Sequence, residues 1–575
     1  MDKRLDALKY GVTGLILVIM ARLFFIQVIQ HDYYVAKAEE EHVATRKIKA
    51  ERGEIYMMDG DQPAAVVLNR AAWTIIVDPM IANPEETEKA ISAAVAGDKI
   101  TAKWEEVFAN RELRYFVVAK NVTREEVRKL EEEALGGVWY QEGNARVYPE
   151  GEMASQLLGF VNNDGVGQYG VEGALNEELA GEDGLLKSVT DVNNVALSIG
   201  DENVKVPAKD GKNVVLTIDR GLQRKIEQEV TKYLDEVRVE NGSALVMDPR
   251  SGKILAMVTL PTYDPSKYAE VPDAGTYVNV PAEIAYEPAS ICKTFTFAAA
   301  VNEGVMNPQT TYNNQGFLQI DEWKIQNAYK GQLGTITMQT GLNYSLNTSS
   351  MTALMLLGGN PTQITAAGRE KLYEYYHDRF GLGEATGIEL NEATGTVWGP
   401  NQGDGDNSRY ANMTFGQSLD LSMVQVAAAF SSVVNGGKYY RPTVVAGEIL
   451  KNGTFSEVTD FSPVREVLSE ETSATMREML YGTRAQWRAN GTDPAGYYSG
   501  GKTGTAQTII NGAYSFDTTV ASYVGFGGTE GELPSYVVMV KVWEDGAKIE
   551  GERHALPLFN RLSGLTRDYL EVRPK

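Results

Sequence analysis

A long apolar run near the N-terminus constrains the fold more than any other feature of this sequence. From Tyr10 to Ile29 nearly every residue is apolar, and Arg22 carries the only formal charge. A run of about 20 apolar residues is long enough to cross the roughly 30 Å of hydrocarbon in a bilayer. The run therefore predicts a single transmembrane helix, with residues 1–30 forming a short cytoplasmic tail and a membrane anchor.

The residues around this run predict its orientation. Lys3, Arg4 and Lys9 precede it, and basic flanking residues tend to stay in the cytoplasm, so the chain beyond residue 30 is expected outside the cytoplasm. The alternative is a cleaved signal peptide, because "AKA" at 36–38 fits a small-x-small cleavage pattern. That pattern lies late and the apolar run is long for a signal peptide, which favours a retained anchor.

Size and composition limit the classes of function. The chain has 575 residues, so two or three folded units are expected. A formal net charge of -23 disfavours a nucleic-acid partner, because phosphate binding needs clustered lysine and arginine. A single cysteine excludes an internal disulfide framework and a cysteine-rich metal site. The four histidines lie far apart and form no His-Glu-x-x-His motif, which disfavours a zinc hydrolase: His31, His42, His377 and His554.

The chain beyond the anchor predicts two α+β regions. Residues 31–205 mix strand-like runs such as "WTIIVDP" with charged helical segments such as "TREEVRKLEEEAL". The stretch 197–213 is polar and rich in turn-forming residues, so it predicts a domain boundary between the two regions. In residues 206–575, strand-like runs lie near both ends, at 244–258 and 518–545, with mainly helical segments between them. This pattern predicts one antiparallel sheet built from both ends of the region, with helices on its faces.

The stretch "YEPASICKTF", residues 286–295, contains the first candidate site. Ser290 precedes Lys293 by three positions, and Pro288 suits the opening turn of a helix. Residues three apart on a helix share a side, so the hydroxyl and the amine would be neighbours. No histidine lies near in sequence, and a lysine can serve as the base if burial or a nearby cation lowers its pKa. Free backbone N–H groups at a helix start can also stabilise an oxyanion.

Two further motifs add to this pair. Chance gives roughly one or two S-x-x-K matches in a chain of this length, so the pair alone is better explained as an ordinary turn of a helix. "NYSLNTSS" supplies Ser345 and Asn347, a hydroxyl that can relay a proton and an amide that can hold a substrate amide. "SGGKTGTAQ" supplies Lys502 and Thr503, which can bind a carboxylate, and Gly504, where a peptide can approach the backbone closely.

The order S-x-x-K, S-x-N, K-T-G resembles the signature of penicillin-binding proteins and serine β-lactamases. "GSALVMDPRSGKILAMVTLPTYDP" and "NMTFGQSLDLSMVQVAAAFSSVVNGG" are similar to parts of the transpeptidase domain. "ERGEIYMMDG" and "RVYPEGEMASQLLGF" are similar to the non-catalytic pedestal of class B high-molecular-mass penicillin-binding proteins. The resemblance thus covers nearly the whole chain and implies an anchor at 1–30, an α+β pedestal at 31–205 and a transpeptidase domain at 206–575.

The resemblance implies a peptidoglycan D,D-transpeptidase that uses no metal or cofactor and is inhibited by β-lactams. Ser290 would attack the D-Ala-D-Ala amide of a stem peptide, with Lys293 as base and Ser345 passing a proton to the leaving amine. Backbone N–H groups of Ser290 and Thr505 would form the oxyanion hole, and a neighbouring stem's amine would complete the cross-link. The resemblance assigns catalysis or substrate binding to eight residues: Ser290, Lys293, Ser345, Asn347, Lys502, Thr503, Gly504 and Thr505.

The same resemblance implies partners. Glycan polymerisation would belong to a membrane-embedded polymerase of the shape, elongation, division and sporulation family, working with proteins of the division or elongation machinery. A division role is favoured because "TFGQSLDLSMVQ" is more similar to the division-type enzymes. The alternatives are a D,D-carboxypeptidase or β-lactamase, in which water replaces the acceptor amine, and a non-catalytic β-lactam sensor or scaffold.

Two positions depart from the family pattern. Ala289 stands where the family usually has glycine, and an added methyl could alter the approach to the helix start. Cys292 is also unusual inside the first motif. Two positions after Ser290 on a helix, it should point away from the nucleophile, which favours a buried core residue over a catalytic thiol.

Overall fold

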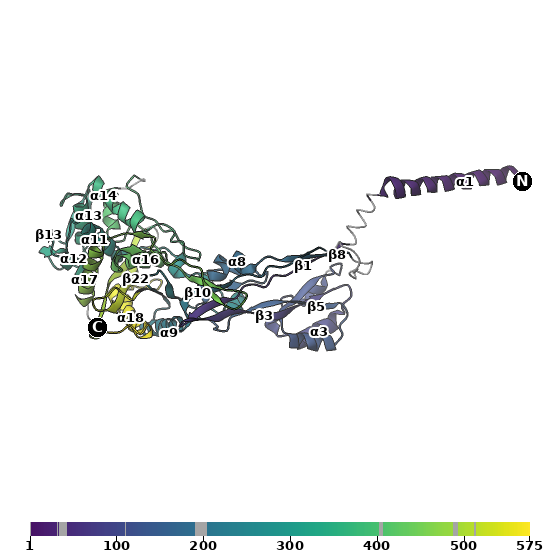
Figure 1. The fold of residues 1–575 in the computed structure, drawn as a ribbon, viewed down its shortest axis with the longest axis horizontal. Helices are drawn as coiled ribbons and strands as arrows, with labels where there is room; N and C mark the ends of the chain where they lie inside the picture. The colour runs from purple at the N-terminus through teal and green to yellow at the C-terminus, as the bar shows by residue number, and fades with distance from the viewer. Residues whose placement is uncertain are drawn as a thin grey trace. The chain divides into compact units, whose positions relative to one another are not determined.

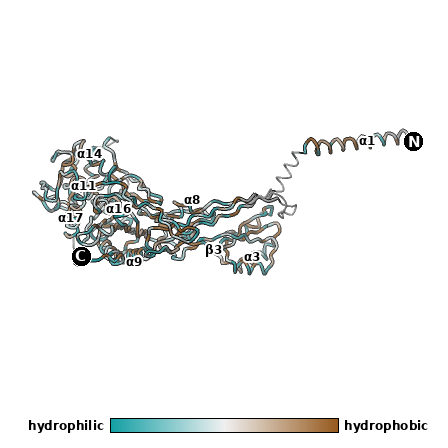
Figure 2. The backbone as a smooth tube through the Cα atoms, viewed as in Figure 1, coloured by the Kyte–Doolittle hydropathy of each residue, from teal (hydrophilic) through white to brown (hydrophobic). Residues whose placement is uncertain are grey.

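The structure is a computed structural model that describes residues 2–31, 33, 43–109, 111–189, 204–401, 406–486, 493–510 and 513–575. Its first element is helix α1 (Asp2–Phe24), which continues into a π-helical segment, η1 (Phe25–Ile29). By length and composition the stretch Ala7–Ile29 is able to cross a membrane, and it is not buried inside the protein. Apolar residues follow one another along this helix in Figure 2. The predicted apolar helix is therefore present, with its side chains exposed.

Two compact units make up the chain: residues 1–53 with 180–211, and residues 54–179 with 212–575. In the first unit, three antiparallel strands form a sheet in the order β1 (Val43–Ile48), β8 (Gly184–Val189) and β9 (Val204–Val206). The sequence predicts turns across 197–213, but part of this stretch is strand β9, because it pairs with β8. Residues 197–203 lie outside the described residues.

The second unit begins with a seven-stranded sheet that combines distant parts of the chain. Its strands are β2 (Ile55–Asp59), β3 (Gln62–Val77), β4 (Phe116–Val122), β5 (Val138–Val147), β10 (Asn213–Asp219), β18 (Val445–Ile449) and β19 (Phe455–Glu457). They follow the order β19-β18-β10-β2-β3-β4, and β5 also pairs with β3. Strand β2 pairs antiparallel with β3 and parallel with β10. The sheet therefore joins the predicted pedestal to the start of the predicted transpeptidase domain.

Helices α3 (Pro84–Ala94) and α5 (Arg124–Glu132) pack with β3, β4 and β5 around a small core of their own (Figure 1). Asn83 caps α3, and Thr123 with Glu126 forms a capping box at the start of α5, so both helices begin at satisfied N–H groups. Shorter elements follow: α4 (Trp104–Ala109), α6 (Ser155–Leu158), β6 (Phe160–Val161), β7 (Gly167–Gln168), α7 (Gly170–Ala174) and α8 (Asn176–Ala180).

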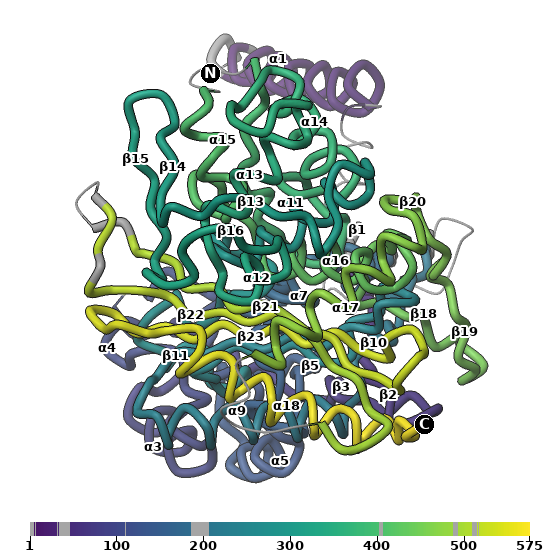
Figure 3. The backbone as a smooth tube through the Cα atoms, turned by 90° about the vertical axis from the view of Figure 1, so that its left-hand side faces the viewer, coloured from purple at the N-terminus to yellow at the C-terminus, as the bar shows by residue number. Residues whose placement is uncertain are grey.

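A five-stranded antiparallel sheet forms the centre of the rest of this unit. In spatial order its strands are β12 (Ile254–Leu260), β11 (Asn241–Met247), β23 (Tyr536–Trp543), β22 (Ala513–Thr529) and β21 (Tyr497–Ile510). Helices α9 (Arg220–Val237) and α18 (Leu556–Tyr569) lie on one side of it, and the helical segments between β12 and β21 lie on the other (Figure 3). The predicted sheet with helices on its faces is confirmed, and so is the α+β class.

The helical segments build the core beside this sheet. They include α10 (Val280–Glu283), α11 (Lys293–Asn302), α12 (Met338–Asn343), α13 (Asn347–Leu357), α14 (Ala366–Tyr373), α15 (Asn407–Met413), α16 (Met423–Val434) and α17 (Glu470–Gln486). Four small strands pair beside them as β13 (Thr311–Asn314) with β16 (Gly334–Thr337), and β14 (Phe317–Ile320) with β15 (Trp323–Gln326). Helix α16 is buried along its whole length, and its alanines allow close packing.

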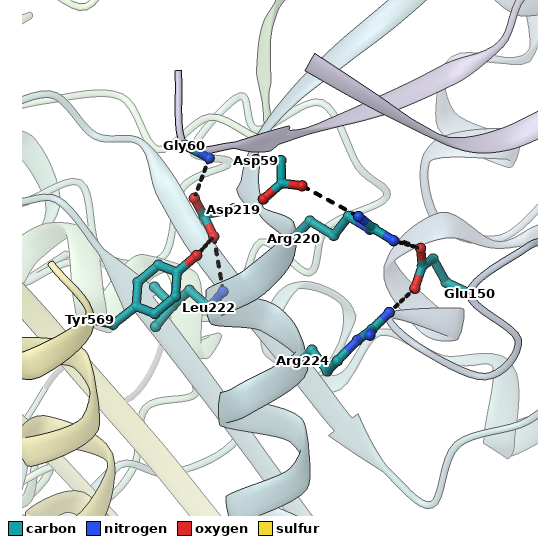
Figure 4. Close-up of polar contacts among 8 residues, drawn as sticks. All are labelled: Asp59, Gly60, Glu150, Asp219, Arg220, Leu222, Arg224 and Tyr569. Atoms are coloured by element: carbon teal, nitrogen blue, oxygen red, sulfur yellow. Dashed lines mark hydrogen bonds and ion pairs between the residues drawn. The ribbon is translucent and has the colours of Figure 1, made fainter. Parts of the chain in front are cut away.

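A polar cluster joins the first sheet of this unit to helices α9 and α18 (Figure 4). The Asp219 carboxylate caps α9 by accepting from Leu222 N at 2.9 Å, and it also accepts from the Tyr569 hydroxyl at 2.6 Å. Arg220 donates from Nε to Glu150 at 2.8 Å and forms an ion pair with Asp59 at 3.3 Å, while Arg224 also pairs with Glu150. These charge-assisted contacts fix the start of α9 against the β2–β3 turn and residue 150.

Candidate active site

Ser290 and Lys293 meet in a tight helical turn. Residues Ala289–Cys292 form a 3₁₀ turn, and the α-helix α11 begins only at Lys293. The sequence predicts both residues at the start of an α-helix, but the structure places Ser290 in the tighter turn before it. In a 3₁₀ turn, residues i and i+3 eclipse one another, so the two side chains point the same way. Lys293 Nζ donates to Ser290 Oγ at 2.9 Å.

Lys293 is buried and surrounded by neutral acceptors. Besides Ser290, its Nζ donates to Asn347 Oδ1 at 2.9 Å and to the carbonyl oxygen of Ser345 at 2.6 Å, and it lies 3.2 Å from Ser345 Oγ. Burial, and then the positive charge of Lys502, hold the pKa of Lys293 well below its ordinary value. When Nζ is neutral, its two protons serve the Asn347 and Ser345 carbonyl oxygens, and its lone pair is left to accept the proton of the Ser290 hydroxyl.

The second motif lies between helices α12 and α13. Ser345 has φ +53, in the left-handed region that a residue with a side chain seldom adopts, and Asn347 is the first residue of α13. This backbone conformation points Ser345 Oγ between two lysines, 3.2 Å from Lys293 Nζ and 2.9 Å from Lys502 Nζ. Strained residues of this kind often occur at functional sites because the surrounding structure holds them in place.

The third motif lies on strand β21. Lys502 is buried, and burial lowers its pKa to about 7, while the nearby Glu552 carboxylate opposes the change. Its Nζ lies 3.3 Å from Thr503 Oγ1, and Thr505 Oγ1 accepts from Gly551 N at 2.9 Å. The structure therefore brings together the predicted residues of all three motifs, although the second and third are 157 positions apart between Ser345 and Lys502.

Gly504 has a structural reason for lacking a side chain. A Cβ atom there would lie 2.5 Å from the carbonyl oxygen of Pro288 and 2.5 Å from Ser522 Oγ. Strand β21 consequently packs directly against the turn that carries Ser290. The sequence attributes this glycine to close approach of a substrate peptide, whereas the close approach seen here is that of the protein's own backbone.

The two unusual residues of the first motif are both buried. Ala289 has φ +49, a left-handed conformation that favours glycine, and its N–H donates to the carbonyl oxygen of Gly416 at 3.0 Å. Cys292 is fully buried, and burial raises the pKa of its thiol, so it stays protonated. Its carbonyl oxygen accepts from Tyr376 OH at 3.1 Å. The environment of Cys292 is that of a core residue.

Sequence reasoning missed two residues around the site, Glu287 and Gly551. The Glu287 carboxylate accepts from Ser418 N at 2.8 Å and from Tyr514 OH at 2.7 Å, which ties the chain just before Ser290 to strand β22. Glu287 precedes the first motif directly, so its position was a usable signal. Gly551 donates its N–H to the Thr505 hydroxyl, but it lies 46 positions away in sequence, so no local pattern indicated this contact. Among the described residues, no three His, Cys, Asp or Glu side chains gather as a metal site.

Comparison with known proteins identifies the family of this fold and site. The model "Penicillin binding protein transpeptidase domain" matches residues 242–563, and the model "Penicillin-binding Protein dimerisation domain" matches residues 47–216. The chain belongs to the penicillin-binding proteins. The resemblance inferred from the sequence motifs is confirmed, including the pedestal and transpeptidase architecture of class B.

Curated relatives of this penicillin-binding protein match it almost from end to end. Stage V sporulation protein D of Bacillus subtilis is 30% identical over 578 residues, covering 99% of this chain and 86% of the relative. Peptidoglycan D,D-transpeptidase FtsI of Escherichia coli is 24% identical over 575 residues, covering 97% of this chain and 90% of the relative.

Solved structures share the fold. Penicillin binding protein 3 of Mycobacterium tuberculosis matches with a TM-score of 0.65 and 23% identity, covering 92% of this chain and 98% of the other. A peptidoglycan synthetase of Bifidobacterium adolescentis matches with a TM-score of 0.70 and 21% identity, covering 93% of this chain and 98% of the other.

Proposed function

We propose that this chain is a peptidoglycan D,D-transpeptidase that acts through an acyl-enzyme on Ser290. One observation carries the proposal: Ser345 Oγ lies 3.2 Å from Lys293 Nζ and 2.9 Å from Lys502 Nζ, and Lys293 Nζ lies 2.9 Å from Ser290 Oγ. These contacts form one continuous path for a proton from the nucleophile to the side of the site where Lys502 lies. Relatives named as peptidoglycan D,D-transpeptidases support the reaction.

Acylation follows from this geometry. Ser290 Oγ attacks the carbonyl carbon of the penultimate D-Ala while neutral Lys293 takes its proton. The negative oxygen that forms accepts hydrogen bonds from the backbone N–H groups of Ser290 and Thr505, which is the largest single source of stabilisation in such sites. The proton then passes from Lys293 through the Ser345 hydroxyl to the leaving nitrogen, the C–N bond breaks, and D-Ala departs.

The third motif is suited to hold the terminal carboxylate of the donor peptide. Lys502 supplies a positive charge, and Thr503 and Thr505 supply hydroxyl groups on the same strand. Because Thr505 Oγ1 accepts from Gly551 N, its own hydrogen is free to point at a carboxylate. Asn347 contacts Lys293 through Oδ1 and donates from Nδ2 to the carbonyl oxygen of Gln326, so it is held firmly beside the nucleophile.

A labelled penicillin tests the nucleophile. The drug mimics the D-Ala-D-Ala end, and its tethered leaving group keeps the adduct on the enzyme. Ser290→Ala should abolish labelling, and Lys293→Ala should slow it by a factor of about 10² to 10⁴. Cys292→Ala is the matched control in the same turn and should label at the normal rate. An adduct mapped to any other residue, or unchanged labelling of Ser290→Ala, would overturn the proposal.

The acceptor distinguishes a transpeptidase from a hydrolase. With an acyl thioester donor and a D-amino acid, a transpeptidase transfers the acyl group to the amine. A D,D-carboxypeptidase or β-lactamase would instead release the free acid at a rate that does not depend on the amine. A non-catalytic sensor or scaffold would consume no donor.

We further propose that residues 1–30 are a retained anchor with the N-terminus in the cytoplasm, followed by a pedestal to residue 205 and a transpeptidase domain from 206. The partners would be a membrane-embedded glycan polymerase and the division machinery, since the relatives include proteins named for sporulation and FtsI. A fluorescent fusion should therefore collect at division septa, and a uniform side-wall pattern would argue for elongation. A reporter at residue 40 that is active in the cytoplasm would overturn the orientation.

A further inference from the structure

Five large apolar side chains are exposed together at one end of strands β3, β4 and β5. We call Met80, Ile81, Leu113, Tyr115 and Trp139 the tip patch; each is between 44% and 59% exposed. Val77, the last residue of β3, pairs with Phe116 at the start of β4 and with Val138 at the start of β5. Met80, Ile81, Leu113 and Tyr115 therefore lie in the segments just beyond the ends of β3 and β4, and Trp139 lies beside them on β5, paired with Ile76. The strands β3 and β5 that carry the patch are labelled in Figure 1. A cluster of this kind marks a surface that meets something other than water.

The loop that carries Met80 and Ile81 is fixed by hydrogen bonds. Asp78 is fully buried; its carboxylate accepts from Met80 N at 2.9 Å and from Arg114 Nε at 3.2 Å. Its carbonyl oxygen accepts from Ile81 N at 3.1 Å and from Ala82 N at 2.9 Å, and its N–H donates to Gly137 at 2.8 Å. These hydrogen bonds hold the loop in place, so Met80 and Ile81 stay exposed and cannot fold back onto the core.

The direction of the patch follows from strand register. Strand β3 runs antiparallel to β2, with Val67 opposite Ile55, and continues ten residues further to Val77. At about 3.4 Å per residue, the end of β3 lies roughly 30 Å past Ile55. Because the two strands are antiparallel, it lies on the side of the N-terminal end of β2. The residues that precede this unit in sequence include the apolar stretch Ala7–Ile29.

We propose that the tip patch rests on a lipid bilayer. Met80 and Ile81 on the protruding loop would reach the acyl boundary, and Tyr115 and Trp139 would lie at the level of the headgroups, where such amphipathic rings are enriched. A fluid surface conforms to a convex apolar tip, whereas a protein partner would need a matching hollow. The formal net charge of -23 gives no attraction to anionic lipid, so the contact rests on apolar burial.

A spin label on the full-length chain in proteoliposomes tests the proposal. Met80→Cys supplies the labelling site, and the native Cys292 is buried, so the label reports one position. The matched control is Trp323→Cys on β15, whose native side chain is 59% exposed. In phosphatidylcholine vesicles, the ratio of oxygen to nickel-chelate accessibility should be at least tenfold higher at position 80 than at 323. It should persist at high salt, because apolar contact is not screened.

Ile81→Asp and Trp139→Ser in the labelled chain separate contact from folding. Both residues are exposed, so these variants should acylate with labelled penicillin at the normal rate while the accessibility ratio at position 80 falls severalfold. Equal nickel accessibility at positions 80 and 323 would overturn the proposal. Protection of position 80 that arises only when the glycan polymerase is added would also overturn it, because the tip patch would then be a protein interface.

Discussion

Replacing Lys502 with methionine should make Lys293 harder to deprotonate. The Nζ atoms of the two lysines lie 3.2 Å and 2.9 Å from the same Ser345 Oγ, so they are at most about 6 Å apart. At an effective dielectric constant of about 20, two like charges at that separation repel by about 3 kcal/mol. Removing the neighbouring charge should therefore lower the ratio of neutral to charged Lys293 roughly a hundredfold.

The assay is the rate of acylation by a labelled penicillin as a function of pH. Acylation needs neutral Lys293, so the wild-type rate rises as the pH passes the pKa of this lysine, which burial and Lys502 hold well below its ordinary value. In Lys502→Met the rise should move to higher pH, because the charged form of Lys293 is no longer repelled. The difference should be greatest below pH 7, since the pKa of Lys502 is about 7 and its charge is lost above that.

A second variant separates charge from substrate contact. Lys502→Met also removes a group that binds the substrate carboxylate, and this loss lowers the rate at every pH. Thr503→Val removes a neighbouring polar contact without removing a charge, so it should change the height of the profile and leave its midpoint in place. A Lys502→Met midpoint that stays at the wild-type pH, or moves to lower pH, would refute the electrostatic reasoning.

Three predictions concern stability, each measured as the free energy of unfolding in urea. Burial lowers the pKa of Lys541 from 10.5 to about 8, so its protonation opposes folding at neutral pH; Lys541→Met should gain about 2 kcal/mol at pH 7, and the gain should shrink above pH 8. Glu172→Gln leaves the buried Arg146 without the carboxylate that lies 2.6 Å away and should lose about 3 to 5 kcal/mol, whereas Glu132→Gln at an exposed pair should lose under about 0.5. Ala289→Gly should gain up to about 1 kcal/mol by relieving a left-handed φ of +49, and a loss would show that the methyl group packs favourably.

Local motifs predicted the site more fully than they predicted its geometry. The three-residue spacing of Ser290 and Lys293 was enough to expect contact, because any helical turn of that length aligns them. The spacing could not distinguish the 3₁₀ turn at Ala289–Cys292 from an α-helix, since the difference depends on how Gly416 and Gly504 pack against that turn. The left-handed φ of Ala289 could likewise not be predicted from the spacing. The sequence did single out this position, because alanine stands there in place of the family's usual glycine.

Distant contacts were accessible only through the family resemblance. No periodicity or spacing relates Ser345 to Lys502, and their hydrogen bond depends on the placement of strand β21 beside the short connection between α12 and α13. The hydrogen bond from Gly551 to Thr505 likewise joins residues that no local sequence pattern relates. Strand β9 was missed because its apolar alternation is only three residues long and lies within a polar, turn-rich stretch, so its pairing with β8 defines it.

The parallel pairing of β2 with β10 has a consequence for how the chain folds during synthesis. Strand β2 emerges early, but the partner on its other edge, residues 213–219, follows more than 150 positions later, and β18 at 445–449 follows β10 after another long interval. Until these strands arrive, β2 presents unpaired N–H and C=O groups that invite pairing with other chains. A nascent chain stalled before residue 213 should therefore depend on a chaperone, whereas one that extends beyond β19 (Phe455–Glu457) has every strand of this sheet.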